Sequence, residues 1–137
     1  MQIVWALMKK KVDPAAARAA VLEVLDWVRD EEAAATPSRQ QLAAAVRGTA
    51  RLLEADAPGH SVEVRVPPFV AVQCIEGPRH TRGTPPNVIE CAPRVWLRLA
   101  LGFVSFDEAQ DGGLVDASGT RVGEVGKWLP VIGGLKL

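Results

Sequence analysis

Apolar side chains recur with the period of an α-helix in two segments of the first half of the chain. The first follows Asp13 and Pro14, a pair typical of a helix start, and extends to about Asp30. The second follows Ser38 and Gln41, which have capping-box spacing, and ends before the stop at 57–59. The expected buried positions are Ala17, Val21, Val24, Leu25 and Val28, then Leu42, Ala45, Val46, Thr49 and Leu53. The pattern predicts an alanine-rich helical hairpin over about 13–57.

From Ser61 the apolar period changes to two, which is typical of strands. Residues 62–66 alternate valine with charged side chains and predict a strand with one solvent-exposed face. Residues 69–75 are almost wholly apolar, so we expect a central strand covered on both faces. Segments 87–91 and 114–118 predict two more strands.

Helical signals interleave with these strands in the second half of the chain. A helix is expected from Pro93 to its end at Gly102, and a short one after the capping-box pair Ser105 and Glu108. Residues 121–129 predict a last amphipathic helix. Helices and strands in this order indicate an α/β protein of the α+β kind.

Composition restricts the function classes. The 137 residues fit one domain, which we place at 13–137, with 1–12 as an extension or flexible tail. The start could be Met1 or Met8. Sixteen basic residues balance sixteen acidic ones, so no net field attracts nucleic acid. No apolar run is long enough for a transmembrane segment, and two cysteines within apolar runs suit a cytoplasmic protein.

The loop between the second and third expected strands concentrates the polar chemistry. It is rich in Gly and Pro, which shape an exposed connector. An anionic head group can accept hydrogen bonds from arginine guanidinium groups, an imidazole, hydroxyls and the backbone N–H groups that glycine leaves accessible. The candidate head-group residues are Arg79, His80, Thr81, Arg82, Thr84 and Asn87. The alternative is a solvated connector without a ligand.

Catalysis and metal binding have weaker support. His80 lacks a clear nucleophile or orienting carboxylate, so we expect no enzyme activity and assign no catalytic residue. His60, His80, Cys74 and Cys91 lack the short spacings of a metal site. We expect neither a metal nor another cofactor.

A set of large apolar residues in the C-terminal half could line a ligand cavity. An apolar tail needs concave apolar walls with few polar groups. The same residues are also what a densely packed core uses, and both interpretations stay open. The candidate wall is Trp96, Leu97, Leu101, Phe103, Phe106 and Trp128.

Three C-terminal segments resemble the sterol carrier protein type 2 superfamily: WLRLALG at 96–102, SFDEA at 105–109 and GLVDASG at 113–119. With VEVRVPPF at 62–69 and GPRHTRGTPPN at 77–87, the chain is most similar to the small actinobacterial sterol carrier family proteins. The resemblance implies a mixed five-stranded sheet covered by helices, with an apolar cavity between them. The residue pattern predicts only four strands, so the fifth would come from the split at Pro67 and Pro68 or from the region of Val131 and Ile132. The helical hairpin at 13–57 has no obvious counterpart in the minimal carrier domain.

The resemblance implies lipid binding without catalysis. We expect a binding protein for a small amphipathic or lipid-like ligand, with its anionic head on the basic loop and its tail against the apolar wall. One alternative is an interaction or regulatory domain of the same fold that lacks an open lipid cavity and binds a protein partner. Another is an accessory domain of a thiol-dependent isomerase.

Overall fold

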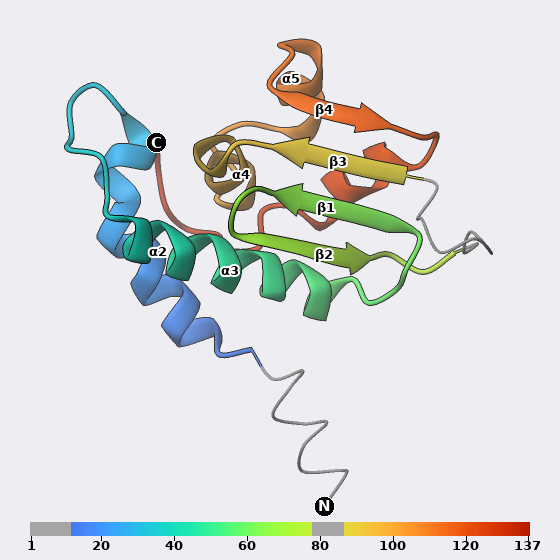
Figure 1. Ribbon diagram of the computed structural model, residues 1–137, viewed down its shortest axis with the longest axis horizontal. Helices are drawn as coiled ribbons and strands as arrows, with labels where there is room; N and C mark the ends of the chain where they lie inside the picture. The colour runs from blue at the N-terminus through green and yellow to red at the C-terminus, as the bar shows by residue number, and fades with distance from the viewer. Residues whose placement is uncertain (1–11, 78–86) are drawn as a thin grey trace, which may run out of the picture.

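The computed structural model describes residues 12–77 and 87–137. Five helices and four strands follow each other in the described chain, and Figure 1 labels all but the last of them. Their bounds are α2 Pro14–Arg29, α3 Arg39–Asp56, β1 Val62–Val66, β2 Val70–Cys74, β3 Asn87–Cys91, α4 Pro93–Ala100, α5 Phe106–Asp111, β4 Val115–Ser118 and the 3-10 helix η1 Val122–Trp128. The proposed extension at 1–12 lies, except for Val12, outside the described residues.

The N-terminal hairpin is confirmed, and its helices begin where local chemistry predicts. Asp13 caps α2 by accepting from the N–H groups of Ala15 and Ala16. Ser38 and Gln41 form both bonds of the expected capping box at α3. Small side chains allow close packing of the pair, since a Cβ added at Gly48 would lie 3.1 Å from the Cβ of Ala17. The two helices pack against each other along their apolar faces.

The sheet is mixed and has the order β2-β1-β3-β4. β1 pairs antiparallel with β2 and parallel with β3, and β3 pairs antiparallel with β4. The prediction of a central position for the 69–75 strand is therefore wrong, because β2 is an edge strand. Its apolar character is explained by α3, which packs against it.

The expected fifth strand is not found in the described residues. Residues 67–69 form the turn between β1 and β2, and residues 131–132 form a bend. Both proposed origins of that strand are therefore wrong, and the sheet of 12–77 and 87–137 has four strands.

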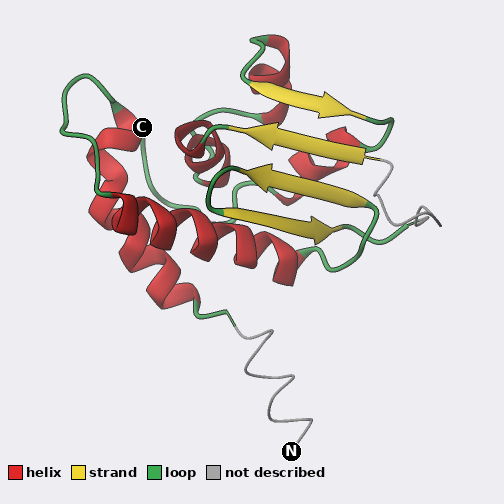
Figure 2. Ribbon diagram, viewed as in Figure 1, coloured by secondary structure: helices red, strands yellow, loops and turns green. Residues whose placement is uncertain are grey.

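One face of the sheet is covered by helices and the other is open. Val62, Val64 and Val66 of β1 point into the core, whereas Glu63 and Arg65 between them point outward and form an ion pair. Glu90 and Asp116 lie opposite each other on the same outward face. Figure 1 looks onto this face, and Figure 2 shows the helices at its edges and behind it.

Helix α4 ends at the glycine cap that the sequence predicts. Gly102, with φ +78°, follows α4, and the N–H of Phe103 donates to the carbonyl of Arg98. The expected amphipathic helix at 121–129 is corrected to the shorter 3-10 helix η1. Val122 and Val125 are buried, but Trp128 at its end is 43% exposed rather than packed with them.

Two arginines of α4 fasten the hairpin to the rest of the domain. Arg94 donates from Nε to the carbonyl of Trp27 and from Nη2 to that of Val28, both at 3.0 Å. Arg98 donates from Nη1 to the carbonyl of Val28 at 2.8 Å. These carbonyls end α2 and have no partner within the helix, so the arginines satisfy them and offset the negative end of its dipole.

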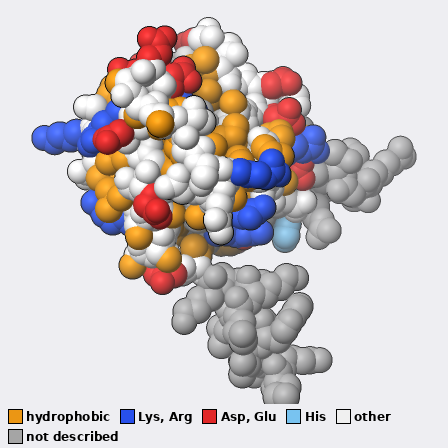
Figure 3. All heavy atoms as spheres, turned by 60° about the vertical axis from the view of Figure 1, so that its left-hand side comes forward, with side chains coloured by type: hydrophobic (Ala, Val, Ile, Leu, Met, Phe, Trp, Pro, Cys, Tyr) orange, Lys and Arg blue, Asp and Glu red, His pale blue; other side chains and the backbone are white. Residues whose placement is uncertain are grey.

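The surface carries both signs of charge. On the face that Figure 3 shows, basic and acidic side chains are interspersed with apolar ones, as expected for a chain with balanced charge. In the part of the chain that the structure describes, no helix combines the length and apolarity needed to cross a bilayer.

Candidate functional site

Glu76 and Asn87 lie on either side of the 78–86 segment and are held by a hydrogen-bond network that we call the loop anchor, formed by Ser61, Glu76, Asn87 and Arg121. Asn87 donates from Nδ2 to the carbonyl of Ser61 at 2.9 Å and accepts at Oδ1 from the N–H of Arg121 at 2.8 Å. Arg121 donates from Nη2 to the carbonyl of Glu76 at 2.9 Å. The anchor therefore fixes the end of one strand segment and the start of the next at one end of the sheet.

Arg121 also forms an ion pair with Glu124, one turn along η1. The hydrogen bond from Arg121 lowers the pKa of the Glu124 carboxyl and raises that of the guanidinium. Gly77 leaves room for this guanidinium, because a Cβ there would lie 1.6 Å from Nη1. Nη1 is buried and, within the described residues, makes no hydrogen bond.

The predicted head-group residues divide into two sets. Asn87 is described, and both polar atoms of its buried amide are used by the loop anchor. The others lie outside the described residues: Arg79, His80, Thr81, Arg82 and Thr84.

Most of the predicted apolar wall lies in the core. Trp96 is 1% exposed and Leu97 is 0% exposed, so neither adjoins a void that water could enter. The indole Nε1 of Trp96 donates to Oγ1 of Thr49 at 2.8 Å, and that hydroxyl donates to the carbonyl of Ala45 at 2.8 Å. Leu101 is also buried. These side chains pack against one another with their polar atoms satisfied.

Of the remaining wall residues, Phe106 is also buried, and Phe103 and Trp128 lie nearer the surface. Phe106 lines a hollow of about 230 Å³ together with Leu99, Leu129 and Pro130. That volume is below the usual range of about 300 to 1,000 Å³ for a ligand pocket. Phe103 is half-buried under the side chain of Arg98, and Trp128 is exposed. The structure therefore does not gather the six wall residues around one cavity.

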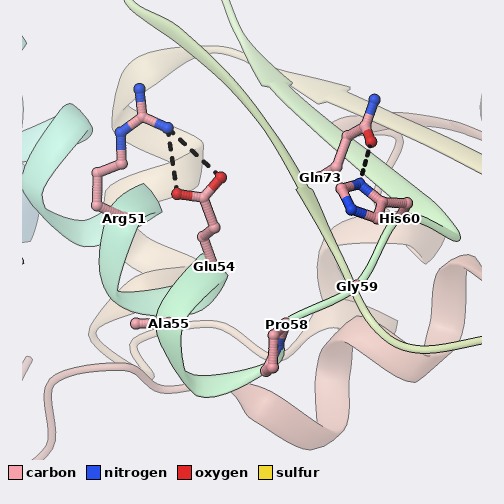
Figure 4. A pocket seen from close by; sticks show the side chains of 7 residues that line it. All are labelled: Arg51, Glu54, Ala55, Pro58, Gly59, His60 and Gln73. Atoms are coloured by element: carbon pink, nitrogen blue, oxygen red, sulfur yellow. Dashed lines mark hydrogen bonds and ion pairs between the residues drawn. The ribbon is translucent and has the colours of Figure 1, made fainter. Parts of the chain in front are cut away.

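A larger hollow, of about 490 Å³, lies between the C-terminal half of α3 and the start of β1 beside β2. In Figure 4 an ion pair on α3 lies on one side, and a hydrogen-bonded pair formed by His60, just before β1, and Gln73 of β2 lies on the other. Nη1 of Arg51 is 3.2 Å from Oε1 of Glu54, and Nδ1 of His60 is 2.7 Å from Oε1 of Gln73. The lining residues are Arg51, Glu54, Ala55, Pro58, Gly59, His60 and Gln73.

The backbone that packs against Gly59, one of the lining residues, is in an unusual conformation. Ile75 has φ +69°, which is rare for a β-branched residue. Three hydrogen bonds hold it: its N–H donates to Ala57, and its carbonyl accepts from the N–H and Oγ of Ser61. Gly59, with φ +151°, lies so close that a Cβ would be 2.1 Å from the Ile75 carbonyl. Strain of this kind persists where the surroundings over-determine it, and it is frequent at binding sites.

The two cysteines are not poised for chemistry. Both are free and buried. Burial, with a smaller contribution from Glu54, raises the pKa of Cys74 to about 12. Burial and then Glu90 raise the pKa of Cys91 to about 12. The described residues contain no cluster of three or more His, Cys, Asp or Glu that could hold a metal ion.

Sequence reasoning missed the larger hollow and the loop anchor. His60 was considered only as a metal ligand, and Gly59 only as part of a helix stop. The Pro58–Gly59 pair signals a change of direction, but nothing local indicates that Gln73 bonds to His60 or that Arg121 bonds to the carbonyl of Glu76. Those contacts depend on strand register and on the return of η1 beneath the sheet.

Comparison with known families gives one match. A family model described as "Bacterial SCP ortholog" matches residues 38–131, from the N-cap of α3 to the segment after η1. No curated protein matches the chain. Because the matched segment covers more than half of the chain and contains all four strands of the described sheet, the protein belongs to this family of bacterial SCP orthologs, which is sterol carrier protein-like.

Proposed function

We propose that this protein is a non-enzymatic binding protein for a small amphipathic or lipid-like ligand, whose anionic head group is bound by the 78–86 segment. The loop anchor is the observation that carries the proposal. It holds Glu76 and Asn87 at one end of the sheet, and the sequence between them contains two arginines and a histidine. Binding groups are often presented in this way, on a loop fixed by its scaffold.

Membership of a sterol carrier protein-like family supports the lipid-like character of the ligand. The apolar tail would take the interior between sheet and helices. Trp96, Leu97 and Leu101 fill that interior, so α4 or α3 would have to shift to admit a tail. The cost of that shift predicts a shorter tail or weaker binding than an open cavity would give.

The closed interior specifically favours a second function. In it, the protein is an interaction domain of the same fold without an open lipid cavity, and the basic segment contacts an acidic surface of a protein partner. Both functions use the same arginines and differ in whether an apolar tail enters the core.

A native mass spectrum of the protein purified from its source, followed by titration with a fluorescent fatty acid, tests the lipid function. We expect a bound lipid-sized mass and micromolar binding. Arg79→Ala and Arg82→Ala should weaken the binding by about 1 to 3 kcal/mol, the range for a hydrogen bond to a charged group, while the thermal midpoint stays nearly unchanged.

Arg65→Ala is the control, because Arg65 lies on the open sheet face and pairs with Glu63. It should leave binding unchanged and cost no more than about 1 kcal/mol of stability. If no lipid mass and no fatty acid binding were found, the lipid function would be excluded and the interaction function would remain. Unchanged binding in both loop variants would exclude the head-group assignment.

A further inference from the structure

The hollow between α3 and β2 is separate from the loop anchor and from the apolar wall, and the proposed function does not use it. We infer that it binds a small zwitterion of the size of a dipeptide, with the ligand carboxylate on Arg51, the ligand ammonium on Glu54, and the rest of the ligand beside the hydrogen-bonded pair of His60 and Gln73. The four side chains lie on two facing sides of the same hollow.

Charge balance is the first argument. The α3 side carries one guanidinium and one carboxylate, whose side chains are 51% and 41% exposed. An exposed pair of this kind contributes little stability, so a ligand can open it at small cost. A ligand with one charge of each sign replaces the pair and leaves neither group unpaired. A phosphorylated ligand would instead bring two negative charges to a side whose net charge is zero.

Hydrogen-bond polarity on the other side is the second argument. Since Oε1 of Gln73 can only accept, the 2.7 Å contact means that Nδ1 of His60 carries the proton. In the neutral ring, Nε2 is then an acceptor, while Nε2 of the Gln73 amide is a donor. The His60 ring can therefore accept a hydrogen bond from an N–H group of the ligand, and the Gln73 amide can donate one to a ligand oxygen.

Size and rigidity agree with such a ligand. At about 30 Å³ per water molecule, a volume of about 490 Å³ holds about sixteen waters, which is close to the number of non-hydrogen atoms in a dipeptide. The Gly59 to Ile75 contact and the three hydrogen bonds of Ile75 fix the backbone behind His60. Ala55 and Pro58 provide apolar surface for a side chain.

The test is an NMR titration of the full-length protein with three probes of matched size. Alanyl-leucine has both charges, alanyl-leucine amide lacks the carboxylate, and N-acetyl-alanyl-leucine lacks the ammonium. We expect alanyl-leucine to shift the Gly59 amide and the Gln73 side-chain amide, and to bind about tenfold or more tightly than either other probe.

Two variants assign the charges. Arg51→Gln should reduce the affinity for alanyl-leucine to that for the amide, without affecting the amide itself. Glu54→Gln should likewise reduce the affinity for alanyl-leucine to that for N-acetyl-alanyl-leucine. Arg18→Gln and Glu23→Gln on α2 are matched controls of the same charge change away from the hollow, and they should leave all three affinities unchanged.

Three results would overturn the inference. The first is the absence of shifts at Gly59 and Gln73 at millimolar alanyl-leucine. The second is equal affinity for the three probes. The third is an equal effect of the hollow variants and the α2 controls. None of these results bears on fatty acid binding or on Arg79 and Arg82, so the proposed function is tested independently.

Discussion

At the scale of single residues, burial determines what the two thiols do. Each has a pKa of about 12 in the folded protein, against an ordinary value of 9.0. Between those values the folded chain keeps protons that the unfolded chain loses, so a rise in pH favours unfolding. The thiol contribution to stability is therefore fully present below about pH 9 and is lost between about pH 9 and pH 12.

This linkage gives a first prediction. Above pH 9 the free energy of unfolding should fall by up to about 1.4 kcal/mol per pH unit for each thiol. Urea denaturation at several pH values between 8 and 11 measures the slope. A double variant, Cys74→Ala with Cys91→Ala, keeps the other groups that lose protons at high pH but lacks the thiols. Its free energy of unfolding should therefore fall less steeply with pH. Equal slopes would mean that the thiols ionise in the folded state.

Asn87 belongs to the predicted head-group site, yet its amide is used within the loop anchor. Asn87→Ala should leave the Ser61 carbonyl and the Arg121 N–H without partners, at a cost of about 2 to 4 kcal/mol. Urea denaturation measures this cost, with Ser118→Ala on exposed β4 as the control. Loss of ligand binding with unchanged stability would instead make Asn87 a ligand contact.

At the scale of elements, the alanine-rich hairpin depends on its attachment to α4. Helices of this composition are marginal alone and need tertiary contacts. Arg94 and Arg98 provide these contacts at the C-terminal end of α2, and burial lowers the pKa of Arg98. The hairpin is therefore held by charged hydrogen bonds as well as by its apolar stripe.

We predict that Arg94→Ala lowers stability by about 2 to 3 kcal/mol, because its charge-assisted bonds to the carbonyls of Trp27 and Val28 and a longer one to that of Arg29 are lost. Arg94→Lys should recover little, since an ammonium cannot reproduce the fork that meets two carbonyls. Hydrogen exchange of the α2 amides should accelerate more than that of the sheet. Arg18→Ala is the control, because Arg18 makes only a 3.5 Å contact. Uniform acceleration would show that α2 does not open on its own.

The accuracy of sequence-based prediction varied with the range of the interactions. Helix starts at Asp13, Ser38 and Ser105 were predictable, because a cap and its partner lie within three residues. The order of the strands was not predictable, because β3 pairs with β1 rather than β2 and nothing in the local sequence indicates this pairing. The larger hollow was missed for the same reason, since Gly59 meets Ile75 only through strand pairing.

At the scale of the whole molecule, hairpin, sheet and α4 share one core. Val46 is 0% exposed at its centre. Val46→Asp should place an unpaired charge there and unfold the entire domain, whereas Ala44→Asp, at an exposed position of the same helix, should be tolerated. Circular dichroism melting compares the two. A Val46→Asp protein with a melting temperature within a few degrees of the parent would contradict a single shared core.

The position of α3 against β2 has a consequence for how this protein would fail. β2 is an edge strand whose sequence, VAVQC, is apolar and lacks charge and proline. Edge strands of this kind recruit strands of other molecules unless something shields them. Here the shield is a helix, whereas β4 at the other edge is short and displays Asp116. Partial loss of the hairpin would thus convert a stability defect into self-association, starting at β2.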